Sequence, residues 1–178
     1  MKYTFTSSDG KWTLEDDQGL SKRTSWQTVV GSVRSVYEEV LQGSTVVSRR
    51  SEQFEPVGGV EVLKKVVLGQ GSTETTTYSY YSSSGNGDNN DQLMQIDYPD
   101  GRWDRFNYDA QGRVITKWES WRDQGPTSNA SLCRSTEYSY DSVAPAAWGD
   151  TGAYRPDLPR RTIRKVLGGE VGRSYMAA

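Results

Sequence analysis

Apolar and polar residues alternate with a period of two along several stretches of the chain. Between residues 93 and 98, Met94, Ile96 and Tyr98 fall on one side of an extended chain, and polar residues fall on the other. Residues 60–68 and 102–109 alternate in a similar way. This period is typical of β-strands that have one buried face and one wetter face. The pattern therefore predicts a sheet with two different faces.

Short clusters of glycine and small polar residues separate these stretches. Asp-Gly and Gly-Gly pairs supply the positive φ angles that tight hairpin turns require. With about 5–6 residues per strand, the chain has room for roughly ten to fourteen strands. We expect an all-β fold of antiparallel hairpins that form a curved or spiralling sheet. The predicted turns are Asp9-Gly10, Gly58-Gly59, Gly69-Gln70-Gly71, Asp100-Gly101, Gln111-Gly112 and Gly168-Gly169.

One segment, Val33 to Leu41, has apolar residues at positions that also suit a helix. Its β-branched residues and the Gln42-Gly43-Ser44 turn that follows suit a strand in a hairpin with Thr45 to Arg49. We favour the strand. The segment from Ala144 to Pro159 is rich in proline, which central strands exclude, and we expect a loop there.

The composition argues against a large aliphatic core and against an enzyme. Apolar residues make up 34% of the chain, and the aromatic residues are mainly 11 Tyr and 6 Trp, whose polar atoms suit half-exposed sheet faces. There is no histidine, which excludes Ser-His-Asp and Cys-His catalysis and His-ligated zinc. We expect no catalytic residue, no metal site and no cofactor. The single Cys133 predicts a small buried residue without an intramolecular disulfide.

Charge and hydropathy restrict the expected partners and location. The formal net charge is -2 and no basic block stands out, so we expect no nucleic-acid partner. No apolar run approaches the ~18–20 residues of a membrane span, so we expect no membrane insertion. The first residues, Met1 to Thr6, lack the apolar segment of a classical signal peptide.

A short pattern occurs three times: an aromatic residue, a small polar residue and a tyrosine, usually followed by aspartate. The tyrosines at the third position of the pattern, Tyr80, Tyr108 and Tyr140, are 28 and 32 residues apart. Aromatic residues at i and i+2 share a sheet face, and a single hairpin cannot bury that face alone, so the copies are expected to stack. The aromatic pairs are Tyr78 and Tyr80, Phe106 and Tyr108, and Tyr138 and Tyr140.

The fullest copy is Tyr108-Asp109-Ala110-Gln111-Gly112-Arg113-Val114, preceded by Asp100-Gly101. It resembles the YD repeat of rearrangement-hot-spot (Rhs) proteins and of the related toxin-complex and teneurin shells. The best-matched repeat is 93–121, and we expect residues 1–178 to form a single YD-repeat-like β domain. In this interpretation Asp109 and Gly112 form the turn, and the aromatic pairs form a ladder.

The resemblance implies a function and a location. Repeats of this family form a sheet that spirals into a hollow shell, which in bacterial members encloses a toxic domain. A full shell needs more repeats than 178 residues supply. We therefore expect a structural module of a bacterial secreted or cell-surface protein, with further repeats or an enclosed polypeptide as partners.

Two alternatives remain beside this interpretation. Trp103, Trp118 and Trp121 could form an aromatic platform that binds sugar rings, which would make the chain a carbohydrate-binding module; otherwise the rings pack in the core. Separately, residues 86–97 match a calcium-loop template poorly, because Asp91 stands where the template has glycine. A solvated hairpin loop is the favoured interpretation of that segment.

Overall fold

The computed structural model describes residues 2–6, 10–15, 20–69, 74–82, 91–140 and 158–176. In these residues there are thirteen β-strands and one short 3-10 helix, η1 (Ala130–Leu132). The chain divides into two compact units, Met1–Ser79 and Tyr80–Ala178. The all-β antiparallel architecture expected from the sequence is confirmed. In the part of the chain described, no helix is long and apolar enough to cross a bilayer.

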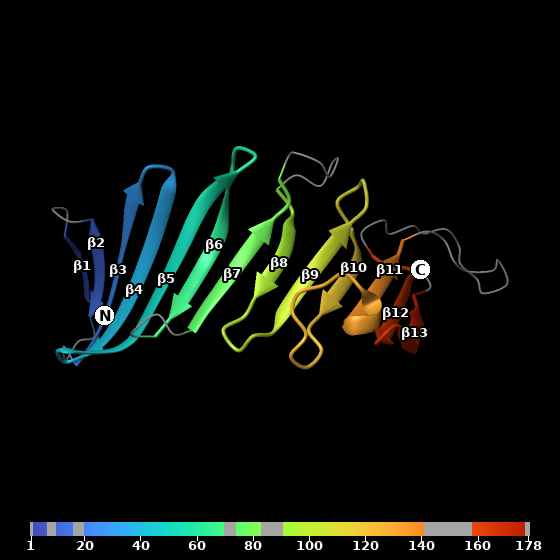
Figure 1. The fold of residues 1–178 in the computed structure, drawn as a ribbon. Helices are drawn as coiled ribbons and strands as arrows, with labels where there is room; N and C mark the ends of the chain where they lie inside the picture. The colour runs from blue at the N-terminus through green and yellow to red at the C-terminus, as the bar shows by residue number, and fades with distance from the viewer. Residues whose placement is uncertain are drawn as a thin grey trace. The chain divides into compact units, whose positions relative to one another are not determined.

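The first unit is an antiparallel meander in which each strand pairs with the next along the chain (Figure 1). Its strands are β1 (Lys2–Thr6), β2 (Lys11–Glu15), β3 (Ser21–Val30), β4 (Val33–Gln42), β5 (Thr45–Val57), β6 (Val60–Leu68) and β7 (Glu74–Tyr80). The strand interpretation of Val33 to Leu41 is confirmed by β4, which forms a hairpin with β5 across the predicted turn.

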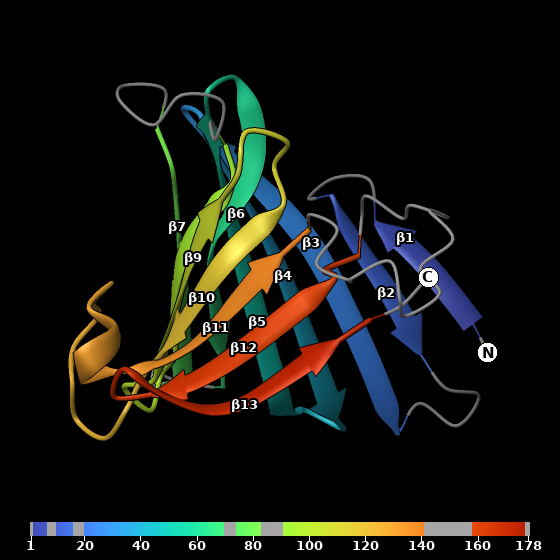
Figure 2. The ribbon, with the colours of Figure 1, turned by 90° about the vertical axis from the view of Figure 1, so that its right-hand side faces the viewer.

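The second unit has the same antiparallel arrangement, and its strands are shorter than β3 to β6 (Figure 2). They are β8 (Leu93–Asp97), β9 (Trp103–Tyr108), β10 (Val114–Glu119), β11 (Arg134–Ser139), β12 (Arg161–Val166) and β13 (Gly169–Tyr175). Most of the proline-rich segment, residues 144–157, lies outside the described residues. Leu158 and Pro159 at its end lead into β12.

Cross-strand side-chain pairs stabilise the first unit. Trp26 and Tyr37 lie directly opposite each other, and their rings stack 5.1 Å apart at an angle of 12°. Arg34 lies opposite Phe54, with its guanidinium 4.2 Å from the ring centre, and it also binds Glu61 at 2.6 Å. Such pairs contribute about 0.2–1 kcal/mol each, so this sheet depends on many small contributions.

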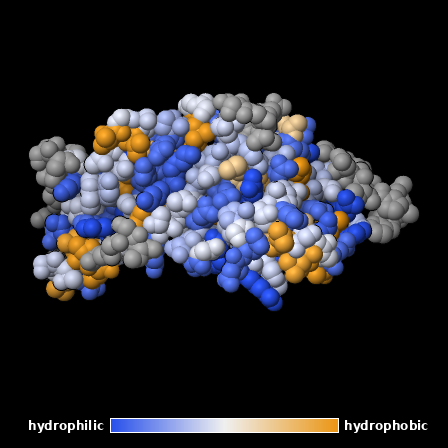
Figure 3. Space-filling model, in the orientation of Figure 1, coloured by the Kyte–Doolittle hydropathy of each residue, from blue (hydrophilic) through white to orange (hydrophobic). Residues whose placement is uncertain are grey.

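Few side chains are fully buried, as the low apolar content predicts. Among the described residues the buried apolar side chains are Val66, Trp103, Cys133, Tyr140 and Ile163. In Figure 3, apolar residues form separate patches within a mainly polar surface. Cys133 is 0% exposed, which confirms the expectation of a buried residue, and burial raises the pKa of its thiol.

The hairpin between β12 and β13 contains a backbone conformation that does not suit its side chain. Val166 pairs with Gly169, so Leu167 and Gly168 alone form the turn, with φ angles of 50° and 82°. The β5–β6 hairpin has the same two-residue loop, and there both positions are glycine, at 58° and 94°. Leucine rarely adopts positive φ, and its side chain here is 48% exposed.

We therefore expect Leu167→Asn to raise the free energy of unfolding by about 0.5–1 kcal/mol, because asparagine tolerates positive φ. Chemical denaturation measures the change. Leu167→Ala is the matched control: it removes the same exposed side chain and keeps the unfavourable φ. Equal stability of the two variants would contradict the strain account.

Candidate functional site

The fullest copy of the three-copy pattern contains the turn after Tyr108, and its aspartate holds the turn closed. Gly112 N donates to Asp109 O at 3.0 Å, and Asp109 N donates to Arg113 O at 2.9 Å. One carboxylate oxygen of Asp109 accepts the backbone N–H groups of Gln111 and Arg113 at 3.0 and 2.9 Å. The other accepts Nε of Arg113 at 2.7 Å. This is a three-residue hairpin loop in which aspartate satisfies two turn amides.

Gly112 suits this turn because its φ is +78°, which side chains disfavour. A Cβ at this position would also lie 2.6 Å from Nε2 of Gln92, so the end of that side chain would have to move. The predicted turn role of Gly112 therefore has a direct geometric cause.

The preceding hairpin closes in the same way with its aspartate at another position. Tyr98 N donates to Arg102 O at 2.9 Å, and Gly101 N donates to Tyr98 O at 3.1 Å. Asp100 accepts the backbone N of Arg102 at 3.1 Å and its Nε at 2.6 Å. The two turns thus share a glycine and an aspartate–arginine clamp. The Asp109 side chain is 18% exposed, against 51% for Asp100.

Three tyrosine hydroxyls connect the strands of the second unit by donating to backbone carbonyls. Tyr108 donates to Leu93 O at 2.7 Å, and Tyr140 donates to Val114 O at 2.9 Å. After the first copy, Tyr81 donates to Phe106 O at 2.7 Å, and this bond runs forward to β9 rather than back to a preceding strand. The Tyr81 ring also meets the Tyr108 ring edge-on, 6.3 Å between centres.

The first copy thus differs from the other two. The repeat pattern aligns Tyr80 with Tyr108 and Tyr140, and the hydroxyl bond beside this copy comes from the next residue, Tyr81. Tyr78 and Tyr80 lie on β7, half-buried, and Phe106 and Tyr138 lie half-buried on β9 and β11.

Arg113 links the turn to the next copy of the pattern. Its guanidinium lies 4.3 Å from the ring centre of Tyr140, while its Nε binds Asp109. Tyr140 is 9% exposed. An aspartate, an arginine, a tyrosine and a backbone carbonyl therefore form one continuous chain from the β9–β10 turn to the end of β11. Nothing in the sequence pattern by itself assigns this role to Arg113.

The tyrosine hydroxyls remain protonated, and so remain donors, up to high pH. Burial raises the pKa of Tyr108 to about 12, and the neighbouring Tyr81 and Tyr80 hydroxyls act in the same direction. Burial also raises the pKa of Tyr81 and of Tyr140. A phenolate could not donate to a carbonyl oxygen, so the neutral form belongs to the folded state.

The three tryptophans of the sugar-platform alternative do not all present open rings. Trp103 is 1% exposed, and its Nε1 donates to Gln124 O at 2.7 Å in the segment that follows β10. The expectation of an exposed face is therefore wrong for Trp103, because a later segment of the chain covers it. Trp118 and Trp121 are half-buried. The guanidinium groups of Arg122 and Arg134 lie 5.9 and 5.4 Å from the centre of the Trp121 ring.

Within the described residues, no group of three or more His, Cys, Asp or Glu side chains could hold a metal ion. Of the calcium-loop match, Asn86, Asp88 and Asn90 lie outside the described residues. Asp97 at its end lies on β8 and accepts Gln95 Nε2 at 2.9 Å.

Removing the Asp109 carboxylate tests the turn directly. We expect Asp109→Ala to lower the free energy of unfolding by about 2 kcal/mol, because the backbone amides of Gln111 and Arg113 and the Arg113 guanidinium lose their acceptor. Asp100→Ala is the matched control, and we expect a loss below about 1 kcal/mol, since Asp100 is more exposed. Urea denaturation measures both. Equal losses in the two variants would show that burial does not set the strength of this clamp.

The raised pKa of Tyr108 predicts an alkaline loss of stability. The folded-state pKa lies above the unfolded value of about 10, so its contribution is present below pH 10 and is lost as pH rises to about 12. We expect the urea midpoint to fall over this range. In Tyr108→Phe the fall should be smaller, after a loss of about 1 kcal/mol at neutral pH. An unchanged pH profile in Tyr108→Phe would be evidence against this assignment.

The comparisons with known proteins assign no family. No protein-family model matches the chain, and no curated protein matches it. The resemblance of the Tyr108 to Val114 segment to the YD repeat therefore stays a prediction from the residues.

Proposed function

We propose that this chain is a non-enzymatic structural module that forms part of a β-sheet shell or scaffold in a bacterial, secreted or surface-associated Rhs-like protein. The observation that carries the proposal is the repeated bracing of hairpins in the second unit. Two successive turns are closed by an aspartate–arginine clamp, and three tyrosine hydroxyls bond to strand carbonyls.

Hydrogen bonds of this kind suit a β-sheet that has solvent on both of its faces. A sheet without a thick apolar layer needs specific polar bonds to fix each hairpin on the next, because burial alone contributes too little. The Asp109, Tyr108 and Tyr140 side chains of the repeat pattern therefore form hydrogen bonds with backbone groups. The proposed partners are further repeats of the same kind, or a polypeptide that the wall encloses.

The outer edge of β13 supports the addition of further strands. In the described part of the chain, β13 pairs with β12 alone. Met176 N donates to Arg160 O, so the next bonded pairs inward are Ser174 with Thr162 and Gly172 with Arg164. The N–H of Arg173, which lies between them, therefore points away from β12. Val171, Tyr175 and Met176 are 66%, 46% and 50% exposed, which leaves apolar surface beside this edge.

Light scattering after size-exclusion chromatography, over a concentration series, tests whether this edge adds strands. We expect the mass to rise above 19.9 kDa with concentration, because the outer edge of β13 pairs with a second edge. Arg173→Pro should hold the chain as a monomer, since it removes an outward N–H without removing a bond to β12.

Arg173→Ala is the matched control, because it removes the same side chain, with its ion pair to Glu170, and keeps the N–H group. We expect this variant to associate as the parent chain does. A monomer at every concentration would contradict the proposal that the sheet continues through β13. Equal association of the proline and alanine variants would place the contact elsewhere.

A further inference from the structure

Two neighbouring hairpins of the first unit end in tips that expose valine. Both tips lie at the same end of the strands (Figure 1), and Figure 3 shows apolar residues gathered there. Val29, Val30 and Val60 are 64%, 76% and 54% exposed. The valines that flank the two-residue loops are Val30 and Val33 in the β3–β4 hairpin, and Val57 and Val60 in the β5–β6 hairpin.

The β4–β5 hairpin has the same kind of loop with polar flanking residues. Gln42 pairs with Thr45 around Gly43-Ser44, as Val30 pairs with Val33 around Gly31-Ser32. The glycines of these two loops have similar φ angles, 58° and 62°. The turn itself therefore does not require valine at the flanking positions, and the exposed valines at the other end need a separate explanation.

The valine tips carry no charge. Residues 24–33 and 56–60 contain no charged side chain. Arg34, which follows the first of these segments, binds Glu61 on β6 through Nε at 2.9 Å and through Nη2 at 2.6 Å. This ion pair joins the two hairpins just behind their tips. The tips can therefore leave water together without dehydrating an unpaired charge.

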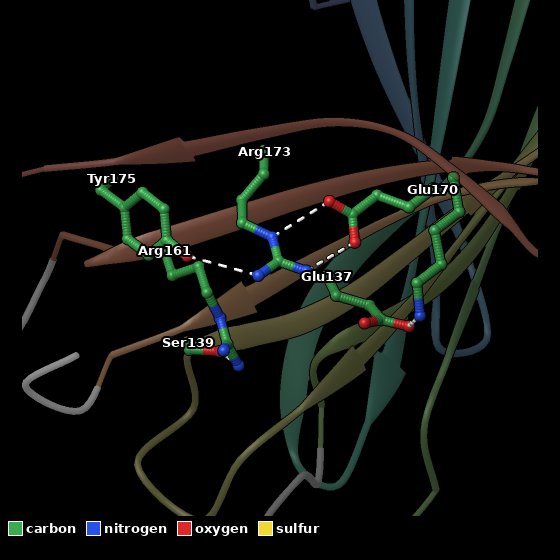
Figure 4. Close-up of polar contacts among 7 residues, drawn as sticks. Glu137, Ser139, Arg161, Glu170, Arg173 and Tyr175 are labelled. Carbon is green, nitrogen blue, oxygen red and sulfur yellow. Dashed lines mark hydrogen bonds and ion pairs between the residues drawn. The ribbon is translucent and has the colours of Figure 1, made fainter.

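The β12–β13 hairpin of the second unit is different, as Figure 4 shows. Its ion pairs begin two residues from the turn on each side. Lys165 binds Glu137 at 2.5 Å, and Glu170 binds Arg173 at 2.6 Å. Moving this turn out of water would dehydrate these charges at a high cost. The β12–β13 turn is therefore unlike the valine tips, although it also exposes an apolar side chain, Leu167.

The exposed valines of the β3–β4 tip lie on both faces of the hairpin. Val29 and Val30 are consecutive residues of β3, so their side chains point to opposite faces. A protein that lies against one face of the hairpin covers one of these side chains. The hydrocarbon of a lipid bilayer surrounds an inserted tip and covers both. The arrangement therefore favours a bilayer over a flat protein surface.

An aromatic pair lies farther from the tip on the face that carries Val30. Trp26 and Tyr37 stack there, and Trp26 is four residues from Val30, or about 13 Å along the strand. Tryptophan and tyrosine are enriched at the membrane–water interface, because each ring has an apolar body and a polar atom. With Val30 a few ångströms inside the hydrocarbon, this pair lies at the level of the headgroups.

We propose that the valine tips of the β3–β4 and β5–β6 hairpins insert shallowly into a zwitterionic lipid bilayer, with Trp26 and Tyr37 at the headgroups. The Arg34–Glu61 pair is neutral as a whole and the chain has a formal net charge of -2, which suits zwitterionic lipids better than anionic ones. A shallow contact needs no membrane-spanning run of apolar residues. This role does not depend on the scaffold proposed above.

A fluorescent dye at the β3–β4 tip tests the proposal. Ser32→Cys places a thiol in the loop for labelling with nitrobenzoxadiazole, and the native Cys133 is 0% exposed. When phosphatidylcholine vesicles are added to the full chain, we expect the emission to rise and shift to the blue. We expect the half-maximal change at roughly millimolar lipid, because a few valines bury less apolar surface than a myristoyl chain, which binds with a constant of about 10⁴ M⁻¹.

Ser44→Cys, labelled with the same dye, is the matched control, because it occupies the same position in the Gly-Ser loop with polar flanking residues. We expect its emission to stay unchanged when vesicles are added. An equal response of the two labels would overturn the proposal, and so would the absence of a response at Ser32.

Valine variants of the chain labelled at position 32 test whether both faces of the tip enter the bilayer. We expect Val29→Ser and Val30→Ser each to weaken vesicle binding about fivefold or more, because each removes apolar surface from one face. Val47→Ser is the matched control: Val47 is 50% exposed and lies near the β4–β5 loop, and we expect the affinity to stay within about twofold. Circular dichroism checks that all three variants fold.

Weakening by only one of the two tip variants would indicate a partner on one face and would overturn the proposal. A dye signal at position 32 that rises with protein concentration in the absence of lipid would show that the tips pack against a second copy of the chain. That result would overturn it as well.

Discussion

The second unit depends on hydrogen bonds from side chains to the backbone at the ends of its strands. Asp109 accepts two amides of its own turn, and Tyr108 and Tyr140 donate to carbonyls of neighbouring strands. Without such partners, the backbone groups at the end of a hairpin form hydrogen bonds with water, and the strand ends fray. A sheet with few buried apolar side chains cannot prevent this by packing, so polar bonds at these positions carry an unusual share of its order.

The same constraint accounts for the composition. Tyrosine supplies apolar area together with a donor that reaches across a strand, which phenylalanine cannot do. Eleven tyrosines and three phenylalanines are consistent with this need. Arginine plays a matching role at the turns, since Arg113 binds Asp109 and covers the Tyr140 ring at once. The two hairpins that share this clamp show that its chemistry tolerates a shift of the aspartate from the first to the third position of the turn.

Local patterns in the sequence predicted the elements well, because their causes are local. Gln111-Gly112 and Asp100-Gly101 form turns for reasons of backbone conformation, and alternation identified the strands on either side of them. The neighbouring turn identified the Val33 to Leu41 segment as a strand.

Tertiary features were predicted less well, because they join residues that are far apart in the chain. The alternation of residues around Trp103 does not show that the segment after β10 covers its ring. Nor does the repeat pattern show that Tyr81 bonds forward to the carbonyl of Phe106 on β9. An open hollow lined by side chains of β10 to β13 was also not predicted, because the sequence does not state the register of these four strands.

Amide hydrogen exchange of the second unit tests most directly whether polar side chains order the ends of its hairpins. The Gln111 and Arg113 amides both donate to the Asp109 carboxylate. The account predicts that both exchange slowly, at rates close to those of amides within β9 and β10, and that protection is lost in Asp109→Ala. Fast exchange of both amides in the parent chain, at the rate of an exposed loop, would contradict it.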